Sequence, residues 1–136
     1  MKKIIVLLLL SLCIVGSINA QNLKTIDDEL QQLITQKSNE LISINIILKS
    51  QIDVDRLNSR RTAFDDEDAK REAVLKEFKN FSEVNQSDVL SFLNAETRSS
   101  RVANVKAHWI TNMINCEATS DVIYKLSEHH DVKAII

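Results

Sequence analysis

The chain has 136 residues, with 17 basic and 19 acidic side chains, so its formal net charge at pH 7 is −2. Its single glycine is Gly16, and it contains no proline. Phosphate-binding loops, dinucleotide-binding turns and nucleophile elbows need glycine where the backbone turns sharply or approaches a ligand. The sequence after Gly16 has no glycine, so these three kinds of site are excluded there. Bases and acids are interleaved from Asp65 to Lys79, which argues against a nucleic-acid partner.

The first residues have the pattern of a secretory signal peptide. Lys2 and Lys3 precede an apolar run from residue 4 to 15, and small or polar residues lead to Ala20. The run is too short to span a bilayer comfortably, so we expect cleavage after Ala20 and no stable membrane anchor afterwards. The sequence therefore predicts a protein that is secreted or located in the periplasm or cell envelope.

Cleavage at Ala20 changes both the charge and the cysteine content. Loss of Lys2 and Lys3 leaves 15 basic against 19 acidic residues, a net charge of −4. Only Cys116 remains, so no internal disulfide can form, and its place in an apolar alternation predicts a small buried hydrophobic side chain.

The remaining chain divides into a short arm and one domain. Residues 21–39 carry apolar side chains at helical spacing and predict an amphipathic helical arm, and residues 40–136 form the domain. The domain opens with Ile42, Ile44 and Ile46 in alternation with mostly polar residues, which predicts a strand.

The rest of the domain alternates between helical and extended patterns. A helix is predicted over residues 66–96, with either a kink or a new Ser87-capped start near Asn85. Residues 97–103 are predicted to be a charged connection. Two strands follow over residues 105–111 and 114–118, joined by an Asn112-Met113 turn, then a Ser-capped helix and a last strand through Val132 and Ala134.

This order predicts an α+β fold of the ferredoxin-like βαββαβ type, a four-stranded antiparallel sheet with two helices on one face. Side chains expected to face the helices are Ile42, Ile44, Ile46, Val105, Ala107, Trp109, Ile114, Cys116, Val132 and Ala134. Those expected on the open face are Ser43, Asn45, Lys106, His108, Asn115, Glu117 and Lys133. An uncovered polar sheet face suits protein docking, although a plain solvated face is equally compatible with the pattern.

No enzyme site is predicted. Asp27-Asp28 and Asp65-Asp66 lie in polar runs that fit helix starts, where nothing desolvates a carboxylate for acid or base catalysis. His108, Glu128, His129 and His130 lack the spacing of a metal site, and adjacent histidines are expected to point in different directions. We therefore expect no metal and no cofactor.

Several short motifs, in their order, resemble the N-terminal pro-segment of secreted bacterial subtilisin-like serine proteases. They are Ile42-x-Ile44-x-Ile46, the long charged helix, His108-Trp109-Ile110-x-Asn112-x-Ile114, Ala118-Thr119, Val122-Ile123-x-x-Leu126 and Asp131-Val132-x-x-Ile135. The resemblance covers about residues 23 to 136. His130 is a departure, because such pro-segments often have proline before the Asp-Val pair.

The resemblance implies that the domain assists the folding of a subtilisin-like protease and inhibits it, with the open sheet face packed on the catalytic domain. The partner would be bound in cis or in trans, because the catalytic domain is not in this sequence and the chain is either a truncated precursor or a free-standing inhibitor. The alternative is an exported ferredoxin-like interaction module unrelated to proteolysis, which needs the same fold and the same free face.

Overall fold

A computed structural model describes residues 25–37, 40–55 and 66–136. The predicted signal peptide and its cleavage site at Ala20 lie outside these residues. The elements are α2 (Asp28–Gln36), β1 (Ile42–Leu48), α4 (Glu67–Thr97), β2 (Val102–His108), β3 (Met113–Ala118), α5 (Ser120–Ser127) and β4 (Val132–Ile135). None of the helices in the described part of the chain is long and apolar enough to cross a membrane.

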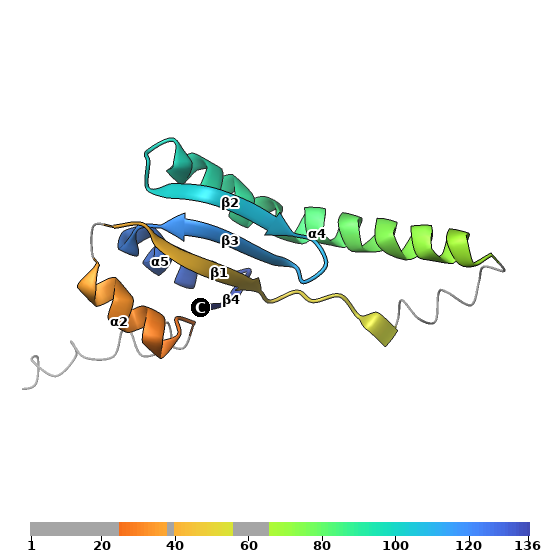
Figure 1. The fold of residues 1–136 in the computed structure, drawn as a ribbon, viewed down its shortest axis with the longest axis horizontal. Helices are drawn as coiled ribbons and strands as arrows, with labels where there is room; N and C mark the ends of the chain where they lie inside the picture. Colours follow the sequence, from red (N-terminus) through yellow and green to blue (C-terminus); the bar gives the residue numbers. More distant parts are fainter. Residues whose placement is uncertain (1–24, 38–39, 56–65) are drawn as a thin grey trace, which may run out of the picture.

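The strands form one antiparallel sheet in the order β2-β3-β1-β4 (Figure 1). Helices α4 and α5 lie behind this sheet in Figure 1, and α2 lies beyond its β4 edge. The described chain is therefore an α+β structure with a four-stranded antiparallel sheet, and its strand order is compatible with a ferredoxin-like fold.

The core lies between the sheet and the helices. Isoleucines at alternate positions of β1 are buried, as the period of two predicts, and they meet Val89 and Leu93 of α4 in one apolar cluster with Val122, Ile123 and Leu126 of α5. Cys116 is buried in the same cluster, so the prediction of a small buried side chain is confirmed, and this burial raises the pKa of its thiol to about 12.

Helix α2 belongs to this core. Asp27 caps its N-terminus by accepting a hydrogen bond from the Glu29 amide, and its buried side chains Leu30 and Ile34 join the apolar cluster. Just before α2, Ile26 forms a parallel bridge with Ile135, so the arm also extends the β4 edge of the sheet.

Both edge strands, β2 and β4, contain a bulge, and the bulge in β4 overturns a predicted orientation. Strand β2 begins at Val102, inside the predicted connection, and its register shifts between Ala103 and Lys106 where Asn104 has a φ of 54°. Asparagine tolerates this left-handed conformation, which β-branched residues avoid. Beyond the bulge the predicted inward orientation is confirmed, because Val105 packs against the core and Ala107 pairs with the buried Ile114, although the Ala107 side chain itself is exposed. Trp109 lies in the turn after β2 and contacts Phe78 of α4.

The edge strand β4 has the second irregularity. Its register with β1 shifts between Ile47 and Leu48, so that Ala134 pairs with Ile47 and Ile135 with Ile46. Paired residues of neighbouring strands point to the same face of a sheet. Ile135 therefore points into the core with the buried Ile46, whereas Ala134 points to the opposite face with Ile47. The predicted inward position of Ala134 is therefore wrong, and that of Val132 is confirmed.

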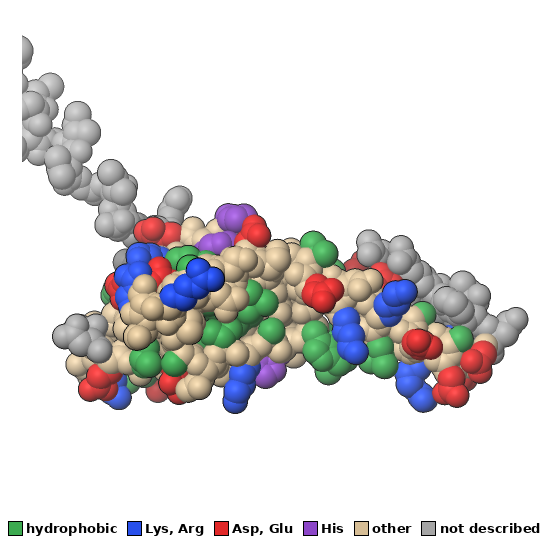
Figure 2. All heavy atoms as spheres, turned by 90° about the horizontal axis from the view of Figure 1, so that it is seen from above, with side chains coloured by type: hydrophobic (Ala, Val, Ile, Leu, Met, Phe, Trp, Pro, Cys, Tyr) green, Lys and Arg blue, Asp and Glu red, His purple; other side chains and the backbone are tan. Residues whose placement is uncertain are grey.

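The 31-residue helix α4 is continuous through Asn85, so neither the kink nor the new start at Ser87 is needed. Its C-terminal half covers the sheet, whereas its N-terminal half projects beyond the strands (Figure 1). Phe78 and Trp109 make an edge-to-face contact with ring centroids 6.3 Å apart, which fixes the β2–β3 turn against the helix. Basic and acidic side chains intermingle along the projecting end (Figure 2).

A charged network joins the end of α4, the start of β2 and α5. The Arg101 guanidinium contacts the Glu96 carboxylate and lies 3.1 Å from Asp121, while the Lys125 ammonium lies 3.6 Å from Glu96. A hydrogen bond from the Thr119 hydroxyl lowers the pKa of Asp121, with further contributions from Arg101 and Lys125. The folded structure therefore stabilises the charged carboxylate form of Asp121 relative to the unfolded chain.

We expect Asp121→Asn to lower the free energy of unfolding at pH 7 by less than about 1 kcal/mol, since the group is exposed to solvent. Because the folded-state pKa of Asp121 lies below its unfolded value, its contribution is present above the unfolded pKa and is lost as pH falls through the folded pKa. Urea unfolding of the wild type and of Asp121→Asn should therefore give free energies of unfolding that differ at pH 7 and agree near pH 2. An equal difference in the free energy of unfolding at both pH values would contradict the conclusion that the charged form of Asp121 is what stabilises the fold.

Candidate binding face of the sheet

The sheet has one face that the described helices do not cover. Side chains on this face alternate with the buried side chains of β1 and β3, and the register places Ser43 opposite Glu117 and Asn45 opposite Asn115. Strand β2 adds Lys106, whose partner is Asn115. His108 is paired with Met113 and joins the same face. The structure thus brings every predicted face residue except Lys133 onto one side of the sheet.

Lys133 is exposed but lies at the bulge of β4, without a partner position in the β1 register. The face also has apolar members, Ile47 and Met113 on the central strands and Ala134 at the edge. Ala134 was missed because the register shift in β4 moves it there, and no local pattern in the sequence indicates such a shift. The face is consequently mixed, with polar side chains around a few apolar ones.

Asparagines form the centre of the face. The side-chain amide of Asn115 donates to the Asn45 side-chain oxygen at 3.2 Å and to the Ile44 carbonyl at 3.1 Å. These bonds use the amide hydrogens of Asn115 within the sheet and leave its side-chain oxygen as an acceptor for an incoming group. This pair fixes the orientation of both side chains, because each is held by a neighbour on the next strand.

Glu117 is the acidic group of the face. It is half-buried between the positions of Ser43 and Ala103, and the described residues offer it no hydrogen bond or ion pair. Its negative charge also contributes to the raised pKa of the neighbouring Cys116 thiol. A half-buried carboxylate without a partner is well placed to accept hydrogen bonds from another protein.

The N-terminal arm leaves this face free. The side-chain amide of Gln31 donates to the Tyr124 hydroxyl of α5 at 2.9 Å, and the Ser120 hydroxyl donates to the Ile34 carbonyl at 3.4 Å. These contacts hold α2 beside α5, with the chain before it along β4, so no described segment crosses the open face (Figure 1). Ser120 bonds to α2 rather than capping its own helix, whose N-cap residue is Thr119, so the predicted serine cap is wrong.

The paired acids occupy the structural positions that the sequence predicts, as far as they are described. Asp27 and Asp66 are the N-cap residues of α2 and α4, and each accepts a hydrogen bond from a backbone amide of the helix it caps. Asp28 lies in the first turn of α2 and is exposed, and Asp65 lies outside the described residues. At these positions carboxylates favour helix formation.

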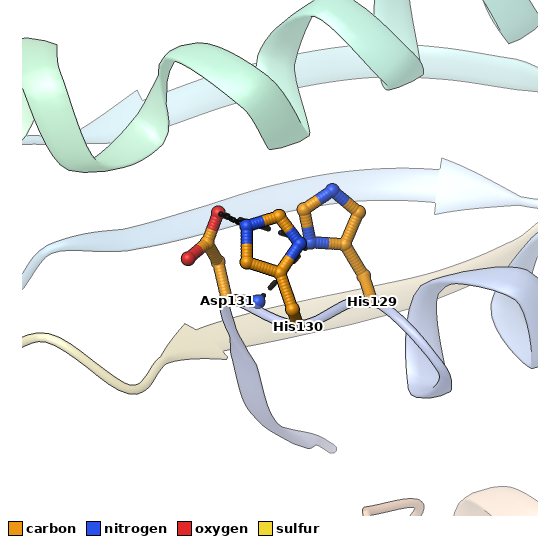
Figure 3. A group of neighbouring side chains, drawn as sticks. All are labelled: His129, His130 and Asp131. Atoms are coloured by element: carbon orange, nitrogen blue, oxygen red, sulfur yellow. Dashed lines mark hydrogen bonds and ion pairs between the residues drawn. The ribbon is translucent and has the colours of Figure 1, made fainter.

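The histidines differ from expectation in one respect. His129 and His130, in the α5–β4 turn, do not point apart: their rings are stacked with centroids 4.7 Å apart and planes inclined by 17° (Figure 3). Asp131 lies beside them, so that these three side chains have the types and spacing that could hold a metal ion, and the group includes neither His108 nor Glu128. The sequence cannot indicate this stacking, because it depends on the shape of the turn.

Comparison of the chain with protein-family models, with curated proteins and with solved structures found no match.

Proposed function

We propose that the chain is a ferredoxin-like, pro-segment-type domain that packs its open sheet face on the catalytic domain of a subtilisin-like serine protease. In this role it assists the folding of the protease and inhibits it, in cis or in trans. The observation that carries the proposal is the uncovered face itself, since α2 packs beside α5 and leaves that side of the sheet free. Export with cleavage after Ala20 belongs to the same proposal.

The resembling motifs occupy positions that suit this role. His108, Trp109 and Ile110 form the end of β2 and the following turn, and Asp131-Val132 leads into the edge strand β4. At the end of β4, Ile136 pairs with Asn45 through both backbone groups, with N···O distances of 2.8 and 3.1 Å. The resemblance to pro-segments also implies that the residues after the last strand lie in the substrate cleft of the protease, and a segment continuing from Ile136 would leave the sheet beside the central strand β1.

The chemistry of the face fits a partner that presents helix N-termini. Unpaired backbone N–H groups at a helix start carry partial positive charge, and the Glu117 carboxylate is a complementary acceptor without a described partner. The free oxygen of Asn115 is a second acceptor beside it. Ile47 and Met113 would supply apolar contact between these polar groups, as interface cores usually do.

The proposal is tested with residues 21–136, which contain every described element, and a purified subtilisin-like protease from the same genome. We expect micromolar domain to inhibit hydrolysis of a chromogenic peptide and to accelerate recovery of activity after the denatured protease is diluted from guanidinium. A chymotrypsin-like serine protease is the control, because it shares the catalytic chemistry on an unrelated fold and should be unaffected.

Two results would contradict the proposal. Absence of both inhibition and accelerated refolding with a correctly folded domain would leave the interaction-module alternative. Equal inhibition of the chymotrypsin-like control would indicate competition by a protein substrate rather than a specific docking face.

A further inference from the structure

The turn between α5 and β4 holds three potential metal ligands in consecutive positions. Nε2 of His130 lies 3.2 Å from Oδ2 of Asp131, and Nδ1 of His129 lies 4.0 Å from the same oxygen. With one donor atom from each residue, all three atoms lie within 4.8 Å of one another (Figure 3). The two rings are stacked, and each has one nitrogen within 4.0 Å of this carboxylate oxygen.

These distances are close to those of a metal site. A zinc ion about 2.1 Å from each of its ligands, in tetrahedral geometry, separates the donor atoms by about 3.4 Å. The pair formed by His130 and Asp131 already meets this spacing. Nδ1 of His129, 4.0 Å from Oδ2 of Asp131, must approach this oxygen by about 0.6 Å, and its ring must rotate out of the stack so that its lone pair points at the ion.

The donor nitrogen of His129 is already in the form that binds a metal. Its Nδ1 accepts a hydrogen bond from the backbone amide of Asp131 at 3.2 Å, so this nitrogen carries a lone pair and not a proton. Coordination would replace that hydrogen bond. Two imidazoles and one carboxylate are a typical donor set for zinc or copper, whereas calcium and magnesium require mainly oxygen ligands.

The backbone of the turn is fixed by the fold. The Asp131 carbonyl accepts a hydrogen bond from the Lys49 amide just after β1 at 2.8 Å, and the His129 carbonyl accepts one from the Val132 amide at 3.1 Å. The turn also follows the C-terminus of α5, where exposed carbonyls favour a positive charge. The ligands are thus held on a rigid turn in a field that attracts cations.

We propose that His129, His130 and Asp131 form a binding site for one divalent transition-metal ion, with zinc as the representative metal and water completing its coordination. The site is independent of the open sheet face, because it lies in the turn between α5 and β4. Its occupation does not depend on whether the domain binds a protease.

The test is calorimetric titration of zinc chloride into residues 21–136, prepared without a polyhistidine tag and freed of metal by chelation. We expect one zinc per chain, a thermal unfolding midpoint that rises with zinc concentration, and no comparable effect of calcium. His130→Ala and Asp131→Asn should each weaken zinc binding on the order of 10-fold or more. The His130 side chain is 75% exposed, so its removal leaves the fold intact.

His108→Ala is the matched control, because His108 is also exposed but lies on the sheet face, and it should bind zinc like the wild type. Cobalt substituted for zinc gives a second measurement, since its visible spectrum should lose intensity in the His130→Ala and Asp131→Asn variants. Absence of zinc binding, or equal affinity of wild type and His130→Ala, would overturn the proposal. So would a stoichiometry of one zinc per two chains, which would mean that the metal bridges separate molecules.

Discussion

Replacing Ile114 with alanine is expected to lower the free energy of unfolding by about 2–5 kcal/mol. Ile114 is fully buried on the central strand β3, opposite Ile46 of β1 and Ala107 of β2. The truncation removes apolar contacts and leaves a cavity that the two adjoining strands cannot easily fill. For a domain of this size, such a loss is a large fraction of a total stability of about 5–15 kcal/mol.

Urea denaturation followed by circular dichroism measures this effect. Ile110→Ala is the matched control, because the same change is made in the turn between β2 and β3, where Ile110 is 62% exposed. The free energy of unfolding of that variant should differ from the wild-type value by no more than about 0.5 kcal/mol. Similar losses in the two variants would contradict the position of Ile114 in the core.

The fold could be predicted where the pattern of one segment determines the structure. In β1, Ile42, Ile44, Ile46 and Leu48 alternate without interruption, so strand and buried face follow from the sequence together. In β4 the same argument identified a strand but assigned Ala134 to the wrong face of the sheet. The cause is the register shift in β4, which depends on the neighbouring strand.

Helix α4 shows why polar residues alone do not indicate a break. The Asn85 amide donates to the Phe81 carbonyl at 2.7 Å, and the Ser87 hydroxyl donates to the Val84 carbonyl at 3.0 Å. These side chains bond to carbonyls of the preceding helical turn, so the backbone keeps its own helical bonds. Gln86, between them, is buried and donates to the His108 and Met113 carbonyls at 3.3 and 3.4 Å, which ties the helix to the β2–β3 turn.

The two candidate sites differ in how far the sequence could indicate them. The open face followed from alternation in β1 and β3, because a strand must present every second residue to one side. The group formed by His129, His130 and Asp131 could not be predicted in this way, since adjacent residues converge only when the turn bends the backbone between them. Side-chain convergence in turns is a property of tertiary structure.

The largest functional effect is expected from reversing the charge at Glu117. If the open face binds a protease as proposed, Glu117→Lys places a cation where helix N-termini would meet an acceptor, and it removes the face's half-buried carboxylate. Disrupting a charged hydrogen bond within an interface costs about 2 kcal/mol or more. This corresponds to a rise of at least roughly 30-fold in the inhibition constant.

The control variant has the same charge reversal at a position away from the sheet. Glu72 is exposed on the projecting half of α4, so Glu72→Lys alters the net charge of the domain equally without touching the sheet. Inhibition constants should rise for Glu117→Lys and stay close to the wild-type value for Glu72→Lys, with urea denaturation showing that both variants are folded. If the two variants inhibited equally well, Glu117 would have no part in docking, and the open face would have to bind through its asparagines and apolar side chains or not at all.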